Sequence, residues 1–389
     1  MKSLKKIISQ EGFVMRVGCP KEIKNGEYRV GITPAAASSY VKAGHEVCVE
    51  RDAGLEAGFS DEEYSAVGAV VAQSPDEIWA KCDMIVKVKE PLPPEYPLIR
   101  ENQILFTYFH FAANRELTET CLRSKSICVA CELVEEPWGL PLLQPMSEVA
   151  GRMSVLMGSY YLARNVGGSG VLSTGVPGVA PAKILIVGGG IVGANAARIA
   201  AGLAAIVVVT DVSHKRLEYL SEILPFNCIS VYSDSHTITK EIIDADMLIG
   251  AVLLRGGAAT PKLITREHLR SMRPGSVFVD VSIDQGGIAQ TSRPTTHDNP
   301  VFVEEGVVHY CVSNMPGAYS RTSTISLSNA TIDYGLQLAN LGVFDACRQN
   351  EALSKGLATC RGKLTVAAVA DAFGLHKAYA DPEAVIHKR

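Results

Sequence analysis

The sequence lacks several features that define large classes of proteins. No uninterrupted apolar run reaches the roughly 20 residues that a helix needs to cross a bilayer, so no membrane span is expected. The net charge is -4, which offers no basic excess for nucleic acid or an anionic membrane surface. The 10 cysteines are sparse over 389 residues, and no second Cys or His pair accompanies Cys128 and Cys131. We therefore expect no disulfide scaffold, no metal site and a cytoplasmic protein with reduced thiols.

The length suggests two domains, and the apolar pattern predicts a sheet in each. Short Val- and Ile-rich runs alternate with helix-like segments over residues 16–132 and again from Lys183 onward, which is typical of an α/β fold. Long helices are predicted at Met146–Asn165 and Ser328–Arg348. We predict two Rossmann-like α/β domains with mostly parallel sheets, joined by these two helices. A discontinuous substrate domain takes residues 15–141 and 310–389, and a nucleotide-binding domain takes residues 142–309.

Residues 1–14, MKSLKKIISQEGFV, form a basic extension ahead of the first expected strand. Leu4, Ile7 and Ile8 lie near helical spacing, so a targeting or membrane-surface helix is one interpretation. A solvated tail is the commoner outcome for so short a segment, and we prefer it.

The clearest motif lies in residues 184–211, ILIVGGGIVGANAARIAAGLAAIVVVTD. Gly188, Gly190 and Gly193 give G-x-G-x-x-G between an apolar strand and an alanine-rich helix, and the next strand ends at Asp211. In dinucleotide-binding folds these glycines allow a tight turn, backbone approach to the pyrophosphate and close packing of helix on strand. An acid in the place of Asp211 binds the ribose hydroxyls and repels a 2′-phosphate, so the motif predicts NAD rather than NADP. The alternative is a glycine-rich turn in an ordinary α/β core.

Ionisable residues near the ends of apolar runs are candidates for substrate chemistry, because open parallel sheets bind ligands at the carboxyl ends of their strands. Alternation along Met84–Glu90 predicts that Lys87 and Lys89 share one face, with Lys89 placed to bind a substrate carboxylate. An ion pair with Glu90 or Glu132 is the structural alternative. His110 ends the run ILFTYFH, where a histidine suits proton transfer at neutral pH or, as the alternative, belongs to the core.

Two further charges complete this set. Asp284 follows an apolar strand in SVFVDVSIDQGG and is a candidate base or water-orienting group; the alternative is an Asx-type turn residue. Arg29 follows the first strand and suits bidentate binding of a carboxylate, or is a solvated loop charge. Together these residues fit the oxidation of an amino or hydroxy acid.

The chain also carries a series of short motifs in a fixed order: MRVGCPKEIKNGEYRVGITP, IVKVKEP, QILFTYFHFAA, PMSEVAGR, GVPGV, VGGGIVG, DQGG, SRPTT, HYCVSNMPGA and TSTISLSNAT. This series resembles the alanine dehydrogenases, in register over about residues 15–375. The wider family includes the nucleotide-binding subunit of proton-translocating transhydrogenases. The 14-residue extension departs from the family pattern, as does GGGIVG, where the family more often has Ala in second place.

By this resemblance, His110 and Asp284 are the catalytic pair, and Arg29 and Lys89 hold the substrate carboxylate. The resemblance implies NAD as cofactor and a homo-oligomer, with a hexamer favoured; the apolar helix near Ser328–Ala346 adds only a weak hint of association. The implied cofactor contacts are Ser147, Gly188, Gly190, Ile191, Val192, Gly193, Asp211, Arg216, Ser233, Val252, Leu253, Val281, Ser282, Ile283, Asp284, Arg293, Val312, Ser313, Asn314 and Met315.

The implied activity is the reversible NAD-dependent conversion of L-alanine to pyruvate and ammonia. We expect His110 and Asp284 to come from different domains and to meet at the substrate, with Asp284 positioning water and His110 moving protons. The alternatives are a transhydrogenase-like NAD(H)-binding subunit, against which all four candidate residues argue, and a catalytically silent NAD-binding sensor, against which the presence of His110 and Asp284 argues. Serine, glycine and 2-aminobutyrate stay open as substrates.

Overall fold

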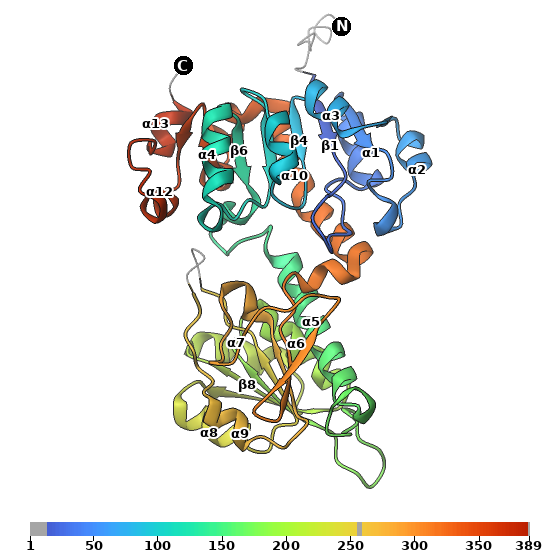
Figure 1. Cartoon of the computed structure of the whole chain (residues 1–389), viewed down its shortest axis with the longest axis vertical. Helices are drawn as coiled ribbons and strands as arrows, with labels where there is room; N and C mark the ends of the chain where they lie inside the picture. The colour runs from blue at the N-terminus through green and yellow to red at the C-terminus, as the bar shows by residue number, and fades with distance from the viewer. Residues whose placement is uncertain (1–13, 255–258, 388–389) are drawn as a thin grey trace, which may run out of the picture. The chain divides into compact units, whose positions relative to one another are not determined.

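The computed structural model describes residues 14–254 and 259–387 and divides the chain into two compact units (Figure 1). Unit 1 contains the chain up to Pro145 and again from Tyr319 onward, and unit 2 contains Met146–Ala318. Except for Val14, the basic N-terminal extension lies outside the described residues, so its interpretation stays a prediction.

Unit 1 is built on a sheet with the strand order β15-β14-β6-β5-β4-β1-β2-β3. Strands β1 to β6 pair in parallel, in the 3-2-1-4-5-6 order of a Rossmann fold. The C-terminal part of the chain extends this sheet, since β14 pairs antiparallel with β6. The strands are β1 (Arg16–Cys19), β2 (Glu46–Glu50), β3 (Val70–Ala72), β4 (Met84–Val86), β5 (Ile104–Thr107), β6 (Ile127–Ala130), β14 (Leu357–Cys360) and β15 (Lys363–Leu364).

The helices of unit 1 begin where the sequence provides caps. Thr33 accepts the N–H of Ala36 ahead of a proline at the start of α1, and Ser60 with Glu63 forms a capping box on α2. Helix α10 (Ser320–Gln349) contains the predicted Ser328–Arg348 helix and is interrupted at Gly342, which has φ 72°. The other helices are α1 (Pro34–Lys42), α2 (Asp61–Ala66), α3 (Pro75–Lys81), α4 (Arg115–Ser124), α11 (Glu351–Gly356), α12 (Ala367–Phe373) and α13 (Pro382–Ile386).

Unit 2 has a second sheet with the order β12-β13-β11-β10-β7-β8-β9, whose first five strands along the chain repeat the 3-2-1-4-5 order. All neighbours pair in parallel except β12, which forms an antiparallel hairpin with β13. The strands are β7 (Lys183–Val187), β8 (Ile206–Asp211), β9 (Cys228–Tyr232), β10 (Met247–Gly250), β11 (Val277–Asp280), β12 (Val301–Glu304) and β13 (Val307–Tyr310). The prediction of two mostly parallel α/β sheets is confirmed.

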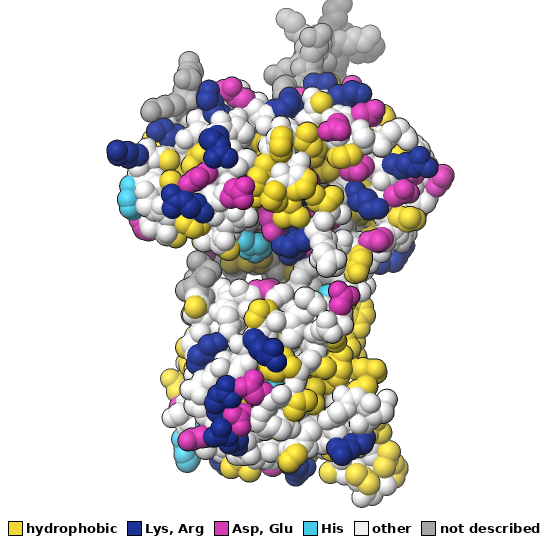
Figure 2. All heavy atoms as spheres, viewed as in Figure 1, with side chains coloured by type: hydrophobic (Ala, Val, Ile, Leu, Met, Phe, Trp, Pro, Cys, Tyr) yellow, Lys and Arg dark blue, Asp and Glu magenta, His cyan; other side chains and the backbone are white. Residues whose placement is uncertain are grey.

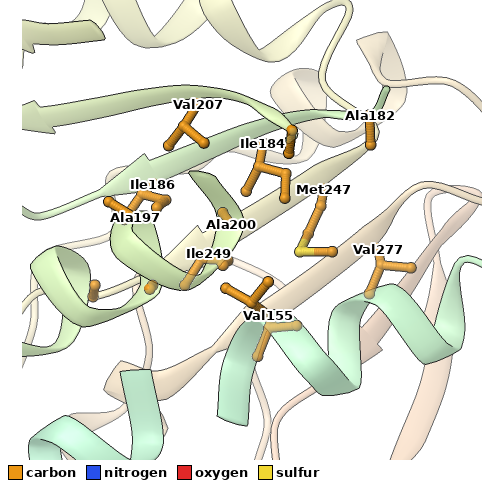
Figure 3. Packing of buried hydrophobic residues seen from close by; sticks show 14 of the residues in the cluster. Val155, Ala182, Ile184, Ile186, Ala197, Ala200, Val207, Met247, Ile249 and Val277 are labelled. Atoms are coloured by element: carbon orange, nitrogen blue, oxygen red, sulfur yellow. The ribbon is translucent and has the colours of Figure 1, made fainter. Parts of the chain in front are cut away.

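The core of unit 2 packs small helix residues against branched strand residues (Figure 3). Ala197 and Ala200 of α6 lie against Ile184 and Val207, and Val155 of α5 lies near Met247 on the same buried cluster. Because alanine keeps the helix close to the sheet, the glycine turn that precedes α6 is held firmly. The helices are α5 (Gln144–Tyr161), α6 (Ile191–Gly202), α7 (His214–Ile223), α8 (Ser235–Ile242) and α9 (Arg266–Ser271).

Strand register brings the carboxyl ends of four neighbouring strands in unit 2 to one edge. Val187 pairs with Thr210 on one side and with Gly250 on the other, and Gly250 pairs with Asp280. The chain order reverses at β7, which is where open α/β sheets bind ligands. In the described ranges, no helix is long and apolar enough to cross a membrane.

Candidate functional site

The three fingerprint glycines of unit 2 have different surroundings, and each fits its predicted role. A Cβ on Gly188, which has φ 104°, would lie 2.5 Å from the carbonyl oxygen of Ala251, and one on Gly193 would lie 1.8 Å from that of Gly188. Gly190, directly before α6, has no heavy atom within 4 Å of its ideal Cβ position. The first and third positions therefore exclude any side chain, while the second leaves open space. That combination fits a pyrophosphate at the N-terminus of α6.

Asp211 ends β8 and binds the turn that follows β7. Its Oδ2 accepts the N–H of Gly189 at 2.8 Å, and its Oδ1 accepts the N–H of Ser213 at 2.8 Å. Arg216 donates to the carbonyl oxygens of Gly189 and Gly190 from the other side. Asp211 thus supports the glycine turn, and its remaining acceptor capacity suits ribose hydroxyls.

The other predicted cofactor contacts of unit 2 lie mostly just beyond strand ends. Val252 donates its N–H to Ser282 Oγ at 3.0 Å, which links the loops after β10 and β11. Asn314 has the left-handed φ of 62° that brings the chain into the turn Met315–Tyr319. The remaining positions are Ser147 in α5, Ile191 and Val192 in the first turn of α6, Ser233 after β9, Leu253 after β10, Val281, Ser282 and Ile283 after β11, Arg293 stacked over Phe302, and Val312 and Ser313 after β13.

Asp284 lies in the single 3-10 turn Val281–Gln285 rather than directly after the strand, which ends at Asp280. Its side chain is exposed. The Asx-type turn that the sequence offered as the alternative role for Asp284 is made by Asp280, whose Oδ1 accepts the N–H of Ser282 at 3.1 Å. Our sequence reasoning missed Asp280, although a carboxylate inside an apolar strand was a usable signal.

In unit 1, Arg29 is buried, so the alternative of a solvated loop charge is wrong. Its guanidinium forms a bidentate pair with Glu27, with Nε donating to Glu27 Oε1 at 2.5 Å. Burial alone would raise the pKa of Glu27, but the hydrogen bonds and charge of Arg29 lower it to about 2. The pair fixes the guanidinium plane before any ligand binds.

Lys89 is the second cation of this region. In residues 14–254 and 259–387, no carboxylate lies within ion-pair distance of its ammonium. Burial, followed by the charge of Arg29, lowers the pKa of Lys89. Arg29 is already neutralised by Glu27, whereas the half-buried Lys89 would be stabilised by an added anion such as a carboxylate.

The prediction that Lys87 and Lys89 share a strand face is wrong. Strand β4 ends at Val86, and Lys87 is a fully buried structural residue that pairs with Glu22 at 3.2 Å and Glu95 at 2.8 Å. Glu22 also accepts the backbone N–H of Lys89 at 3.2 Å. The two lysines therefore serve different purposes, and the sequence could not show which carboxylates would reach Lys87.

His110 is exposed, so the alternative of a core histidine is also wrong. It lies beyond the end of β5 at Thr107, with φ 50° and ψ 44° in the left-handed region. The backbone N–H of His110 donates to Glu132 Oε1 at 2.7 Å. Such a backbone conformation is costly for a residue with a side chain and recurs at functional sites. The sequence suggested Glu132 only as an ion-pair partner for lysine, so its contact with the backbone of His110 was missed, as was the role of Asp280.

The described cysteines are mostly buried. All ten are free thiols, and burial raises the pKa of Cys19 to about 12. In the described part of the chain, no cluster of His, Cys, Asp and Glu could hold a metal ion.

Comparisons with known proteins identify two family domains along the chain. Residues 18–150 match "Alanine dehydrogenase/PNT, N-terminal domain", and residues 154–367 match "Alanine dehydrogenase/PNT, C-terminal domain". A protein of Methanococcus maripaludis named alanine dehydrogenase is 51% identical over 93% of this chain and 97% of its own length. The Bacillus subtilis protein of the same name is 48% identical over 92% of this chain and 95% of its own.

Solved structures extend the comparison to the fold. One named L-alanine dehydrogenase is 47% identical, covers 92% of this chain and 99% of its own, and has a TM-score of 0.90. A transhydrogenase from Sinorhizobium meliloti has a TM-score of 0.79 at 23% identity over 90% of this chain and 99% of its own, which is a likeness of fold alone. From these matches, the predicted family is confirmed: this chain belongs to the alanine dehydrogenase/PNT family.

Proposed function

We propose that this protein catalyses the reversible, NAD-dependent oxidative deamination of L-alanine to pyruvate and ammonia. The observation that carries the proposal is the close identity, over nearly the whole chain, to relatives that bear the name alanine dehydrogenase. The chemistry of the described residues supports it. Unit 2 offers a dinucleotide cradle with an acid in place for ribose, and unit 1 offers two cations and an exposed histidine.

In this proposal, Arg29 and Lys89 bind the carboxylate of the substrate. Arg29 is held in a fixed plane by Glu27, and Lys89 contributes a point charge from a half-buried position. Binding the carboxylate at two points orients Cα, and the binding energy offsets part of the entropy cost of reaching the transition state. The same contacts serve alanine and pyruvate, since both carry this group.

Proton transfers fall to His110 and Asp284. When bound, NAD supplies the acceptor for the hydride that leaves Cα of alanine. Asp284 orients the water that attacks the resulting imine carbon, and His110 moves protons as the carbinolamine collapses to pyruvate and ammonia. Both side chains are exposed in their own units, so each is accessible to substrate and water.

The test is an assay of the purified protein with alanine and NAD, followed by NADH absorbance, and of pyruvate, ammonia and NADH in reverse. We expect turnover in both directions, with weaker activity on serine, glycine and 2-aminobutyrate. NADH binding without turnover of any amino acid would contradict the proposal and favour a silent sensor. Hydride exchange between nucleotides without alanine turnover would favour a transhydrogenase-like subunit.

We also propose that the active form is a homo-oligomer, with a hexamer favoured by the family resemblance. Unit 2 exposes apolar side chains on one tight loop, where Leu172, Val176 and Val179 are 62%, 55% and 63% exposed. Figure 2 shows hydrophobic side chains gathered along one side of this unit, and a further hydrophobic patch on the surface of unit 1. Light scattering tests this, and an active monomer would contradict it.

The free thiols support the proposal of a cytoplasmic protein.

A further inference from the structure

We propose that Asp280 is a positioning residue for the reaction: its buried carboxylate fixes the turn that carries Asp284. This rests on the proposed function, because the role of Asp284 belongs to it. Asp280 ends β11, and Asp284 lies in the single turn that follows, where its side chain is exposed. What holds this turn therefore decides where Asp284 points.

The Asp280 carboxylate closes the loop between Val281 and Ser292. Its Oδ1 accepts the N–H of Ser282 at 3.1 Å, at the start of the loop. Its Oδ2 accepts the N–H of Ile288 at 3.0 Å and the hydroxyl of Ser292 at 2.6 Å, at the far end. One fully buried side chain thus joins both ends of the segment that contains Asp284.

Two glycines leave the space that this carboxylate occupies. A Cβ on Gly287, which has φ 75°, would lie 2.3 Å from Asp280 Oδ2. A Cβ on Gly250, the residue paired with Asp280 on β10, would lie 2.7 Å from Oδ1. The DQGG motif is therefore explained in part by a residue that lies four positions before its aspartate.

The opposite side of the turn is held from the segment after β10. The Oε1 of Gln285 accepts the backbone N–H of Leu254 at 2.9 Å, and the Nε2 of Gln285 donates to the carbonyl oxygen of Leu254 at 2.8 Å. Thr260 donates its N–H to the carbonyl oxygen of Gln285 at 2.9 Å. With Asp280 on one side and these contacts on the other, the backbone that carries Asp284 has little freedom. Preorganisation of this kind is what a group that orients water requires.

The energetic cost of Asp280 supports a functional reason for it. Burial raises the pKa of Asp280 to about 6, although its hydrogen bonds and the charge of Lys262 oppose this. A raised carboxyl pKa means that the folded protein loses stability as pH rises from the ordinary aspartate range through about 6. A buried carboxylate that is costly when ionised, yet ties a loop together, is better explained by the loop than by stability.

The experiment compares three variants of the full-length protein in steady-state kinetics and in hydrogen exchange of the segment 281–292. Asp280→Asn keeps the shape of the side chain but replaces one accepting oxygen with an NH2 group, which would face the N–H and O–H groups that the carboxylate now accepts. We therefore expect faster exchange in this segment and a kcat about 100-fold lower at saturating substrates. Asp284→Asn should lose turnover with normal exchange in the segment. Asp246→Asn is the matched control, since Asp246 is also a buried aspartate of unit 2, lies directly before β10 and accepts the N–H of Lys183 at 3.0 Å. It should lower Tm with kcat unchanged.

The outcomes separate the inference from the proposed function. Normal kcat in Asp280→Asn beside a large loss in Asp284→Asn would overturn the inference alone. Normal turnover in Asp284→Asn would overturn the proposed role of Asp284 itself. If Asp280→Asn does not fold, Ser292→Ala decides, because it removes one contact of the same carboxylate. Faster exchange of the segment with a lower kcat supports the inference, and unchanged values overturn it.

Discussion

Glu132 holds the backbone of His110, whose N–H donates to Glu132 Oε1 at 2.7 Å. The same carboxylate accepts the N–H of Phe109 at 3.1 Å, so one side chain binds two successive amides. Glu132 follows β6 and His110 follows β5, which pair in parallel. The turn after the neighbouring strand thus supplies the group that holds the backbone of His110 in its left-handed conformation.

We predict that Glu132→Ala destabilises unit 1 by about 1–3 kcal/mol, since two amides lose a charged acceptor. It should also lower kcat more than it raises KM for pyruvate, because the backbone of His110 is no longer fixed. Glu132→Gln should lie between this variant and the wild type, since a neutral carbonyl oxygen in the place of Oε1 still accepts these amides without the charge. Thermal unfolding and steady-state kinetics check this, and a Glu132→Ala variant with unchanged kcat would show that His110 needs no such support.

The lowered pKa of Lys89 predicts a pH dependence for pyruvate binding. Burial and Arg29 favour the neutral amine, so Lys89 loses its proton at a lower pH than an ordinary lysine. The KM for pyruvate should therefore rise in the alkaline range while the KM for NADH changes little. Lys89→Arg keeps its charge and should flatten this rise. A KM that rises equally in both proteins would exclude Lys89 as the titrating group.

Alanine substitutions at two fingerprint glycines should affect different properties, the stability of unit 2 in one case and NADH binding in the other. Gly193→Ala places a Cβ 1.8 Å from the carbonyl oxygen of Gly188, so we expect a strongly destabilised unit 2. Gly190→Ala meets no heavy atom within 4 Å, so this protein should melt as the wild type does but bind NADH more weakly. Thermal unfolding and NADH titration distinguish them. Tight NADH binding by Gly190→Ala would place the pyrophosphate elsewhere.

Replacement of Asp211 should relax the choice of cofactor. Asp211→Gly removes the charge that would repel a 2′-phosphate, so the ratio of kcat/KM for NAD to that for NADP should fall. The variant should also lose about 1–3 kcal/mol of stability, because the amides of Gly189 and Ser213 lose their acceptor. Equal use of both cofactors by the wild type would contradict this reading of Asp211.

Much of the fold could be predicted because its signals are local. Val- and Ile-rich runs separated by helices predict parallel strands, and the glycine spacing predicts the turn before α6. The exact strand ends could not be predicted, since Lys87 continues the alternation of β4 but lies beyond its last residue, Val86. Hydrophobic alternation does not show where a ladder of hydrogen bonds ends.

The residues proposed to contact substrate could be predicted from the sequence, but the residues that hold their backbone could not. His110, Asp284 and Lys89 follow apolar runs and could be found from the sequence. Glu132 and Asp280 could not be assigned their roles, because each acts on a backbone amide that becomes its neighbour only after the sheet has formed. The partner of a buried carboxylate is decided by tertiary structure, and sequence spacing carries no signal for it.

The most direct test of the proposed function is the steady-state kinetics of His110→Ala and Asp284→Asn beside their NADH affinity. General acid–base groups typically contribute about 10²–10⁴-fold, so each variant should lose kcat on that order. NADH binding by His110→Ala should stay normal, because the fingerprint glycines and Asp211 are untouched. Loss of turnover with intact NADH affinity is the result that the proposed mechanism predicts. Near-normal turnover of the His110→Ala variant would contradict it.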